Sequence, residues 1–269
     1  MNNKYAIVTG ASSGIGKFLS IELAKENFNV IMISRNKKKL QQVSNEINLL
    51  NCNCSIIVAD ISKEKDISKI SSQIKSLNID VLINNAGVGI FNKIQDISFK
   101  EWNHHIDINL TGTFMMTKIV VDNMIKNKSG KIIGISSVVA TSGNPGQSNY
   151  VAAKSGMIGF YKSIALEVAS RKINVNLISP GFIISPMTSK LDEKQKNQIL
   201  DKIPMKRFGE RHELENLASY LMSDGSAYIN GEVVTIDGGE WIAGAAEFSE
   251  LTKLPESMWK AMAERRKKK

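Results

Sequence analysis

The chain has 269 residues, a formal net charge of +9 and two cysteines. Its apolar runs fall short of the ~18 residues that a membrane-spanning helix needs, so we expect no integral membrane protein. Cys52 and Cys54 form a C-x-C pair without a second cysteine or a histidine cluster nearby. This argues against a zinc site and favours reduced thiols in the cytoplasm.

The first strand is expected at residues 4–9, which leaves no room for a signal peptide before it. A glycine turn, Gly10-Ala11-Ser12-Ser13-Gly14-Ile15-Gly16, then opens an amphipathic helix. Gly10 permits a tight turn, Gly14 lets the backbone approach a pyrophosphate, and Gly16 lets the helix pack closely on the strand. The spacing is G-x-x-x-G-x-G and not the G-x-G-x-x-G of the general dinucleotide fingerprint. The three glycines can still serve the same structural roles.

Six more strand-like segments alternate with helical patterns. They lie at residues 29–34, 55–59, 80–83, 131–136, 173–178 and 232–236. The alternation predicts an α/β fold, a single-domain Rossmann doubly wound parallel sheet of about seven strands with helices on both faces. We expect this domain over residues 1–245 and a C-terminal extension at 246–269. Ligands of such sheets bind outside the carboxyl ends of the strands.

Polar or turn-forming residues follow these strands, as a ligand site at that edge requires. They are Arg35, Asp60, Asn84-Asn85-Ala86-Gly87, Ser136-Ser137 and Pro180-Gly181. An arginine after the second strand can hold a 2′-phosphate, and no carboxylate stands there to repel it, so Arg35 predicts NADPH over NADH. Alternatively, Arg35 is a solvated charge leading into Lys37-Lys38-Lys39. Asp60 is either an adenine contact or the N-cap of the next helix.

Tyr150 and Lys154 are four residues apart and share one face of a predicted helix. The ammonium would favour the phenolate and lower the pKa of the phenol toward the range where a general acid works. Ser137 adds a hydroxyl at a spacing that suits proton transfer to a carbonyl. Taken alone, the pair could be an ordinary exposed helical pair.

Asn109 lies inside a predicted long helix, where asparagine is locally unfavourable, and this misfit is consistent with a functional role. His104 and His105 precede it and have no metal-ligand spacing to His212. Both are expected to be structural or exposed, and no metal site is predicted.

Several motifs together resemble the short-chain dehydrogenase/reductase family over residues 4–240: Thr9-Gly10-x-x-x-Gly14-x-Gly16, Asp60, Asn84-Asn85-Ala86-Gly87, Asn109, Ser137, Tyr150, Lys154 and Pro180-Gly181. The resemblance implies that Tyr150 is the general acid of carbonyl reduction and that Lys154 lowers its pKa and holds the nicotinamide ribose. It further implies that Ser137, in preference to Ser136, polarises the substrate oxygen and that Asn109 holds a relay water. The implied cofactor contacts are Gly10, Ser12, Ser13, Gly14, Ile15, Gly16, Arg35, Asp60, Ile61, Asn85, Ala86, Gly87, Tyr150, Lys154, Pro180, Gly181 and Ile183.

Within this family, residues 130–139, 143–150, 165–171 and 179–183 look most like bacterial 3-oxoacyl-acyl-carrier-protein reductases. This implies NADPH-dependent reduction of the keto group of a 3-oxoacyl thioester, carried by acyl carrier protein or coenzyme A, in fatty acid biosynthesis. Two departures are visible. Val88-Gly89-Ile90-Phe91 replaces a segment that usually contains Thr-Arg-Asp, and residues 228–241 with the extension are more similar to bacterial relatives of 2,4-dienoyl-coenzyme A reductase.

A dienoyl reductase is therefore one alternative, and another short-chain carbonyl reductase or alcohol dehydrogenase is a second. A non-catalytic NAD(P)-sensing regulatory protein is an alternative of a different class, because a fold alone does not establish activity. The complete set of Ser137, Tyr150 and Lys154 favours reduction of a ketone.

Residues 185–210 cover the substrate in the family, so we expect a lid there, with an ordinary surface helix and loop as the alternative. Phe182, Ile183 and Met187 either line an acyl channel or belong to the core. The resemblance implies a homotetramer built through the helices that carry Asn109 and Tyr150. The basic run at 265–269 is expected to be a solvated tail, with attraction to an acidic carrier or weak contact with nucleic acid as alternatives. No nucleic-acid motif and no membrane partner is predicted.

Overall fold

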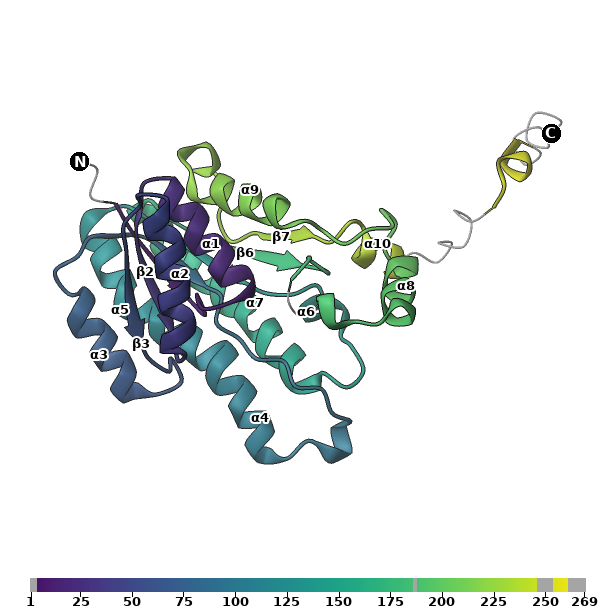
Figure 1. The fold of residues 1–269 in the computed structure, drawn as a ribbon, viewed down its shortest axis with the longest axis horizontal. Coiled ribbons are helices and arrows are strands. Elements are labelled where there is room, and N and C mark those ends of the chain that lie inside the picture. Colours follow the sequence, from purple (N-terminus) through teal and green to yellow (C-terminus); the bar gives the residue numbers. More distant parts are fainter. Residues whose placement is uncertain (1–3, 186–187, 246–253, 261–269) are drawn as a thin grey trace.

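The computed structural model describes residues 4–185, 188–245 and 254–260 (Figure 1). Its centre is one seven-stranded, fully parallel sheet in the order β3-β2-β1-β4-β5-β6-β7. The strands are β1 (Tyr5–Thr9), β2 (Asn29–Ser34), β3 (Cys54–Val58), β4 (Ile79–Asn84), β5 (Gly130–Ile135), β6 (Ile173–Pro180) and β7 (Val233–Ile236). Each lies at one of the seven predicted segments, and the predicted Rossmann-type fold class is confirmed.

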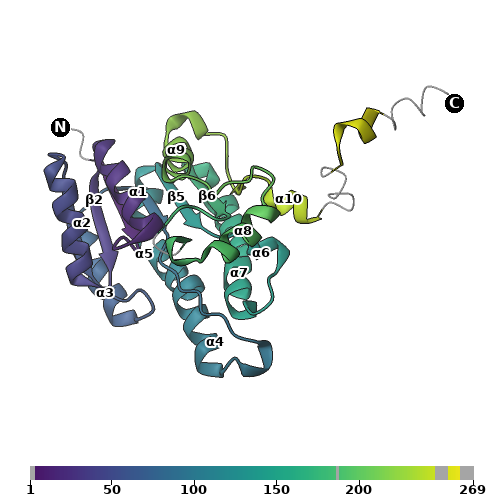
Figure 2. The same cartoon turned by 45° about the vertical axis from the view of Figure 1, so that its right-hand side comes forward.

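The labelled α-helices are α1 (Gly14–Lys25), α2 (Lys37–Leu49), α3 (Glu64–Ile74), α4 (Phe99–Ile106), α5 (Gly112–Asn127), α6 (Val139–Ser142), α7 (Ser148–Val168), α8 (Glu193–Lys202), α9 (Arg211–Met222) and α10 (Glu240–Ala245). Helices α1, α2 and α9 cover one face of the sheet, and α3, α5 and α7 cover the other (Figures 1 and 2). Short helices α6, α8 and α10 gather beyond the carboxyl ends of the strands in both views.

The two faces have separate apolar cores because side chains alternate along each strand. Ala6 and Val8 of β1 pack with the core under α1, α2 and α9, whereas Ile7 packs with the core under α3, α5 and α7. All three side chains are fully buried. A strand buried on both faces reads as a continuous apolar run, which is why these strands stand out in the sequence.

The long helix expected around Asn109 is interrupted. A π-helical turn at Asp107–Thr111 separates α4 from α5. The Asn109 amide donates to the His105 carbonyl at 3.1 Å and to the Val88 carbonyl at 3.0 Å, and its Oδ1 accepts from the Val88 backbone N–H at 3.2 Å. These bonds to a neighbouring segment explain how an unfavourable residue is held here, and π turns of this kind are frequent at functional sites.

None of the helices in the described part of the chain is long and apolar enough to cross a membrane. Within the same residues, no cluster of three or more His, Cys, Asp or Glu side chains could hold a metal ion. The extension at 246–269 lies outside the described residues except for 254–260, so the basic run at 265–269 has no structural account.

Candidate active site at the carboxyl edge of the sheet

A cleft of about 2890 Å³ lies along the carboxyl ends of the strands. From β1 the chain adds β2 and β3 on one side of the sheet, and from β4 it adds β5, β6 and β7 on the other side. Ligands of such sheets bind at this switch point between β1 and β4. Nearly all of the predicted catalytic and cofactor residues line this cleft; Gly16 and Asn109 lie just behind its wall. The residues predicted to form the site thus share one cleft at the carboxyl edge of the sheet.

The glycine turn after β1 is tightly packed on one side and open on the other. Gly10 has a φ of +68°, and a Cβ there would lie 2.8 Å from Ala86 Cα. A Cβ on Gly16 would lie 2.5 Å from the Gly10 carbonyl oxygen, so this glycine is needed for close packing of α1. Gly14 has a φ of +55°, and a Cβ there would meet no described atom within 4 Å. The residue that caps α1, Ser13, makes no side-chain cap bond. Free helix N–H groups thus face open space, which suits an anion.

Asn85 cross-links the first and fourth strand ends. Its amide donates to the Thr9 carbonyl at 3.0 Å, while the Thr9 hydroxyl accepts from the backbone N–H groups of Asn85 and Ala86 at 3.0 and 3.1 Å. Asn85 was predicted to contact a cofactor. Its side chain fixes the backbone of the cleft wall, and the residue itself lines the cleft.

Gly87 brings the Asn109 and Lys154 side chains together. A Cβ at this position would lie 2.6 Å from Asn109 Oδ1 and 3.6 Å from Lys154 Nζ. Lys154 is 3 % exposed, and its ammonium donates to the Ile135 carbonyl at 2.6 Å. Burial lowers the pKa of Lys154 to about 8. The ammonium therefore has a strong backbone partner at the end of β5 and points into the site.

Tyr150 and Lys154 lie on one face of α7, with Lys154 Nζ 5.8 Å from the centre of the Tyr150 ring. Ser137 lies beside the phenol and lowers its pKa, but burial has the larger effect and raises the pKa of Tyr150. The expected acidification by Lys154 is thus wrong for the chain by itself, because desolvation of the phenolate dominates. Ser136 is 4 % exposed and its hydroxyl contacts the Lys154 carbonyl at 3.5 Å, so Ser137 is the serine that faces the phenol.

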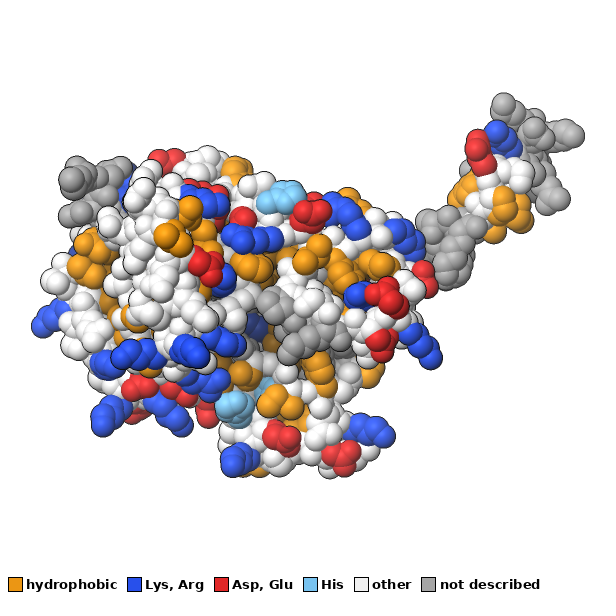
Figure 3. All heavy atoms as spheres, viewed as in Figure 1, with side chains coloured by type: hydrophobic (Ala, Val, Ile, Leu, Met, Phe, Trp, Pro, Cys, Tyr) orange, Lys and Arg blue, Asp and Glu red, His pale blue; other side chains and the backbone are white. Residues whose placement is uncertain are grey.

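The second and third strand ends form a polar corner. Arg35 Nη1 lies 3.8 Å from Asp60 Oδ2, and the Arg35 side chain is 58 % exposed. Ser12 and Ser34 share a hydrogen bond of 2.8 Å between their hydroxyls. Figure 3 shows basic side chains gathered over the lower end of α2, where Lys37, Lys38 and Lys39 follow Arg35.

Asp60 caps a turn and not the helix. Its Oδ1 accepts from the Ser62 backbone N–H at 3.0 Å and from the Ser62 hydroxyl at 2.7 Å, while α3 begins only at Glu64. Burial alone would raise the pKa of Asp60, but the bonds from Ser62 and the charge of Arg35 outweigh it and lower the pKa. Asp60 and its neighbour Ile61 remain on the cleft wall.

The segment after β6 leaves the sheet beyond Pro180 and folds back on itself at Gly209, which pairs with Ile183. Gly209 donates to the Phe182 carbonyl and accepts from the Ile184 N–H, both at 2.9 Å, and the Phe182 and Phe208 rings stack with centres 6.0 Å apart. Ile183 is 6 % exposed and forms the bridge to Gly209, so it is a packed residue at the base of the loop. Met187 lies outside the described residues.

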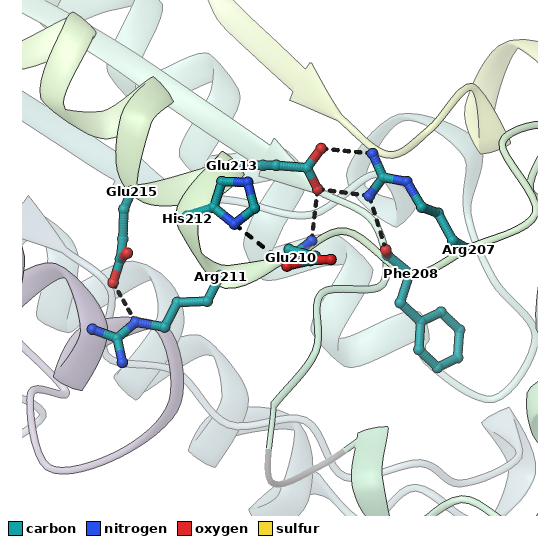
Figure 4. A network of polar contacts seen from close by, with 7 residues as sticks. All are labelled: Arg207, Phe208, Glu210, Arg211, His212, Glu213 and Glu215. Atoms are coloured by element: carbon teal, nitrogen blue, oxygen red, sulfur yellow. Dashed lines mark hydrogen bonds and ion pairs between the residues drawn. The ribbon is translucent and has the colours of Figure 1, made fainter.

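An ion-pair network closes this loop on α9 (Figure 4). Arg207 donates two hydrogen bonds to Glu213, at 2.8 and 2.7 Å, and Glu213 also accepts from the Glu210 backbone N–H at 2.7 Å. These bonds lower the pKa of Glu213 from 4.5 to about 2. The network ties the end of the loop to the first turn of α9.

Glu213→Gln should lower the thermal unfolding midpoint at pH 7 by no more than about 3 °C, because exposed ion pairs stabilise weakly. A lowered carboxylate pKa contributes stability above the unfolded value of 4.5, and this contribution disappears as pH falls through about 2. The difference between wild type and variant should therefore shrink between pH 4.5 and 2 in calorimetry. A difference that stays constant over this range would show that the pair has no linked proton.

Three residues of the site were not found from the sequence. His105 is fully buried beside the site. Thr188 bonds the backbone of Ser185 and Ile183 at the cleft wall. Glu240 at the start of α10 faces Gly181, and its Oε2 is buried with no hydrogen-bond partner among the described residues. Burial, and secondarily Asp237, raises the pKa of Glu240. His105 and Glu240 face segments that are distant in sequence, Ile90 and Asn149 for His105 and Gly181 for Glu240, so no local pattern signals them. Thr188 bonds only to nearby residues of its own loop, and a single threonine in a loop has no distinctive pattern.

Known proteins match both the sequence and the fold. A family model described as short chain dehydrogenase matches residues 4–196. The chain is 40% identical over 243 residues to the 3-oxoacyl-[acyl-carrier-protein] reductase FabG of Staphylococcus epidermidis, covering 89% of this chain and 100% of that relative. It is 39% identical over 241 residues to FabG of Thermotoga maritima, covering 89% and 98%. A crystal structure of 3-oxoacyl-[acyl-carrier protein] reductase from Brucella melitensis has a TM-score of 0.84 and 28% identity, covering 89% and 91%.

Proposed function

The chain belongs to the short-chain dehydrogenase family, and we propose that it is an NADPH-dependent oxidoreductase that reduces the keto group of 3-oxoacyl thioesters. The observation that carries this proposal is the arrangement of Ser137, Tyr150 and Lys154 around one cleft at the carboxyl edge of the sheet. The similarity to 3-oxoacyl-[acyl-carrier-protein] reductases over 89% of the chain supports the substrate class. A role in fatty acid biosynthesis follows from that class.

The cleft fits a dinucleotide with a 2′-phosphate. The free N–H groups at the start of α1 suit the pyrophosphate, and the open side of Gly14 lets it approach the backbone. Arg35 is exposed, and its ion pair within the described residues is a long 3.8 Å contact to Asp60, so its guanidinium can turn to clamp a phosphate. We infer that the turn at 10–16, Arg35, Asp60, Ile61, the segment 85–87 and the segment 180–183 surround the cofactor.

NADPH, when bound, supplies a hydride to the carbonyl carbon. The Ser137 hydroxyl donates a hydrogen bond to the carbonyl oxygen, which orients the ketone and favours negative charge on that oxygen. Tyr150 gives its phenolic proton to the same oxygen. Burial raises the pKa of Tyr150 and so disfavours the phenolate that remains, which therefore needs a stabilising partner. The Lys154 ammonium stabilises the phenolate that results, and its bond to the Ile135 carbonyl fixes its position.

Asn109 keeps the cleft wall in place. We also propose that it helps to orient the proton relay that restores the proton of Tyr150. Both polar atoms of its side chain bond to Val88, and the Thr113 hydroxyl donates to its carbonyl at 3.0 Å. The resemblance assigns a relay water to this residue, and the π turn places it next to Lys154 across Gly87. Residues 185–210 are proposed as a substrate lid, since α8 contributes Gln198 and Ile199 to the cleft wall.

The substrate class is tested by a panel of thioesters measured with both NADPH and NADH. A 3-oxoacyl thioester should give a higher kcat/KM than a 2,4-dienoyl thioester or a simple ketone. The similarity of residues 228–241 to dienoyl reductases makes that thioester the informative competitor, because Trp241 at the end of this segment lines the cleft. Faster turnover of the dienoyl substrate would reassign the enzyme, and binding of NADPH without any turnover would favour a sensor.

We also propose a homotetramer in the cytoplasm, where thiols such as those of Cys52 and Cys54 remain reduced. Helices α5 and α7 present apolar side chains to solvent: Phe114 is 44 % exposed and Leu166 is 83 % exposed. Phe114 also packs edge-on against Phe160 of α7, with ring centres 6.0 Å apart. A shared apolar surface across both helices suits association of identical chains.

Leu166→Glu should reduce the mass of the assembly in light scattering from four chains to two or one, because a carboxylate would be buried without a partner in the interface. Leu49→Glu is the matched control, since Leu49 is also 83 % exposed but lies on α2. If Leu166→Glu retains the wild-type mass, α7 does not form the interface.

A further inference from the structure

His105 is a fully buried, titratable side chain to which the proposed reaction gives no task. It lies in the last turn of α4, one helical turn before Asn109. Its Nε2 accepts from the Ile90 backbone N–H at 3.0 Å, and its Nδ1 lies 2.8 Å from the Glu101 carbonyl oxygen. The Asn149 amide nitrogen also contacts Nδ1, at 3.1 Å. The ring therefore joins three parts of the chain: α4, the segment after β4, and the start of α7.

The two backbone partners determine the tautomer. A backbone N–H can only donate, so Nε2 must be the unprotonated nitrogen facing Ile90. A carbonyl can only accept, so Nδ1 carries the proton and donates it to Glu101. In the opposite tautomer Nδ1 would accept from the Asn149 amide, but Nε2–H would face the Ile90 N–H and the Nδ1 lone pair would face the Glu101 carbonyl. In the tautomer assigned here, both Nδ1 and the Asn149 nitrogen are donors, so Asn149 is a packing contact of the ring and not a hydrogen-bond partner. His105 is thus a neutral acceptor for the Ile90 N–H, and this bond requires that Nε2 carries no proton.

The bond to Ile90 places a wall of the cleft. Val88, Gly89 and Phe91 line the cleft, and a Cβ on Gly89 would lie 3.9 Å from the Tyr150 ring. Asn109 holds Val88 by its two backbone groups, and His105 holds Ile90 two residues later. Gly89 is fixed between these two anchors and faces the phenol.

The same ring also contacts the start of the helix that carries the phenol. The Asn149 Oδ1 accepts from the Tyr150 backbone N–H at 2.8 Å. Asn149 is buried and lies in contact with the His105 ring. A shift of the imidazole would change the wall and the start of α7 relative to each other. Small displacements at such a distance from the reacting atoms alter how a substrate is oriented.

We propose that His105 is a positioning residue that fixes residues 88–91 as the substrate-facing wall beside Tyr150. The proposal rests on the proposed function for its kinetic consequence, because the wall matters only if a carbonyl substrate lies between it and the phenol. The anchoring itself is a property of the fold and is measured separately.

The test compares His105→Gln with His105→Asn. Glutamine can place an acceptor oxygen where Nε2 lies, whereas asparagine is too short to reach the Ile90 N–H. Three quantities are measured: kcat and KM for a 3-oxoacyl thioester at saturating NADPH, the Kd of NADPH, and hydrogen exchange of a peptide that spans residues 88–92. His104→Asn is the matched control, because His104 is the neighbouring histidine on α4 and its ring meets the His105 ring edge-on.

His105→Asn should lower kcat/KM about 10-fold, mostly through KM, and speed exchange at Ile90, because a buried N–H is left without an acceptor. The Kd of NADPH should stay within about 2-fold of wild type, and His105→Gln and His104→Asn should resemble wild type in all three quantities. Equal losses in the Gln and Asn variants, or unchanged exchange at Ile90 in His105→Asn, would overturn the proposal. If wild type reduces no 3-oxoacyl thioester, the proposed function fails while the exchange data still decide the anchoring role.

Discussion

Tyr150→Phe should lower kcat/KM for a 3-oxoacyl thioester about 10³-fold and leave the Kd of NADPH within about 2-fold of wild type. The phenol lies beside Ser137 in the cleft, where it can donate its proton to a carbonyl oxygen. Removal of the hydroxyl changes neither the ring nor its packing, so binding of the cofactor should persist. The measurement is a steady-state assay of NADPH absorbance together with a fluorescence titration of NADPH.

Tyr220→Phe is the control for this variant, because Tyr220 is 48 % exposed on α9 and lies outside the cleft lining. Ser137→Ala and Ser136→Ala sharpen the result. Ser137→Ala should lose activity, whereas Ser136→Ala should lose little, since the Ser136 hydroxyl makes a long 3.5 Å contact to a backbone carbonyl. Turnover retained in Tyr150→Phe would remove the phenol from the role of general acid.

Arg35→Ser should raise KM for NADPH about 30-fold and leave KM for NADH nearly unchanged. A guanidinium donates charge-assisted hydrogen bonds to a phosphate, and loss of such bonds costs about 1.5–3 kcal/mol, whereas a 2′-hydroxyl makes no comparable demand. Arg35 can turn toward a ligand because its contact to Asp60 is long, at 3.8 Å, and its side chain is 58 % exposed. Kinetics with each cofactor at a fixed thioester concentration measure the change.

Lys38→Ser is the matched control for Arg35→Ser, because Lys38 is an exposed cation of the same basic group on α2. If both variants change KM for NADPH by the same small factor, Arg35 acts only through the general positive potential around the cleft. A large effect confined to Arg35 supports a direct phosphate contact.

The fold could be predicted in most respects because its signals are local. The inner strands are short apolar runs with buried side chains on both faces, and polar or turn-forming residues lie at or near the strand ends, so the alternation of segments defined the sheet and its carboxyl edge. The boundary errors are small. For example, β6 continues to Pro180, two residues beyond the expected end, because Pro180 still pairs with Ile236 of β7.

What could not be predicted depends on contacts between distant segments. The π turn at Asn109 depends on bonds to Val88, and the role of His105 depends on Ile90 and Asn149. Helical periodicity contains no information about such partners. The pKa of Tyr150 was misjudged for a related reason: the ammonium four residues away was visible in the sequence, but the burial that outweighs it was not.

The most direct test of the proposed activity follows the product as well as the cofactor. The full-length chain is incubated with NADPH and a 3-oxoacyl thioester, and the acyl product is identified by mass spectrometry. We expect one 3-hydroxyacyl thioester formed for each NADPH consumed, at a rate that exceeds the rate with NADH. An unchanged 3-oxoacyl thioester in the presence of bound NADPH would contradict the assignment as a ketone reductase.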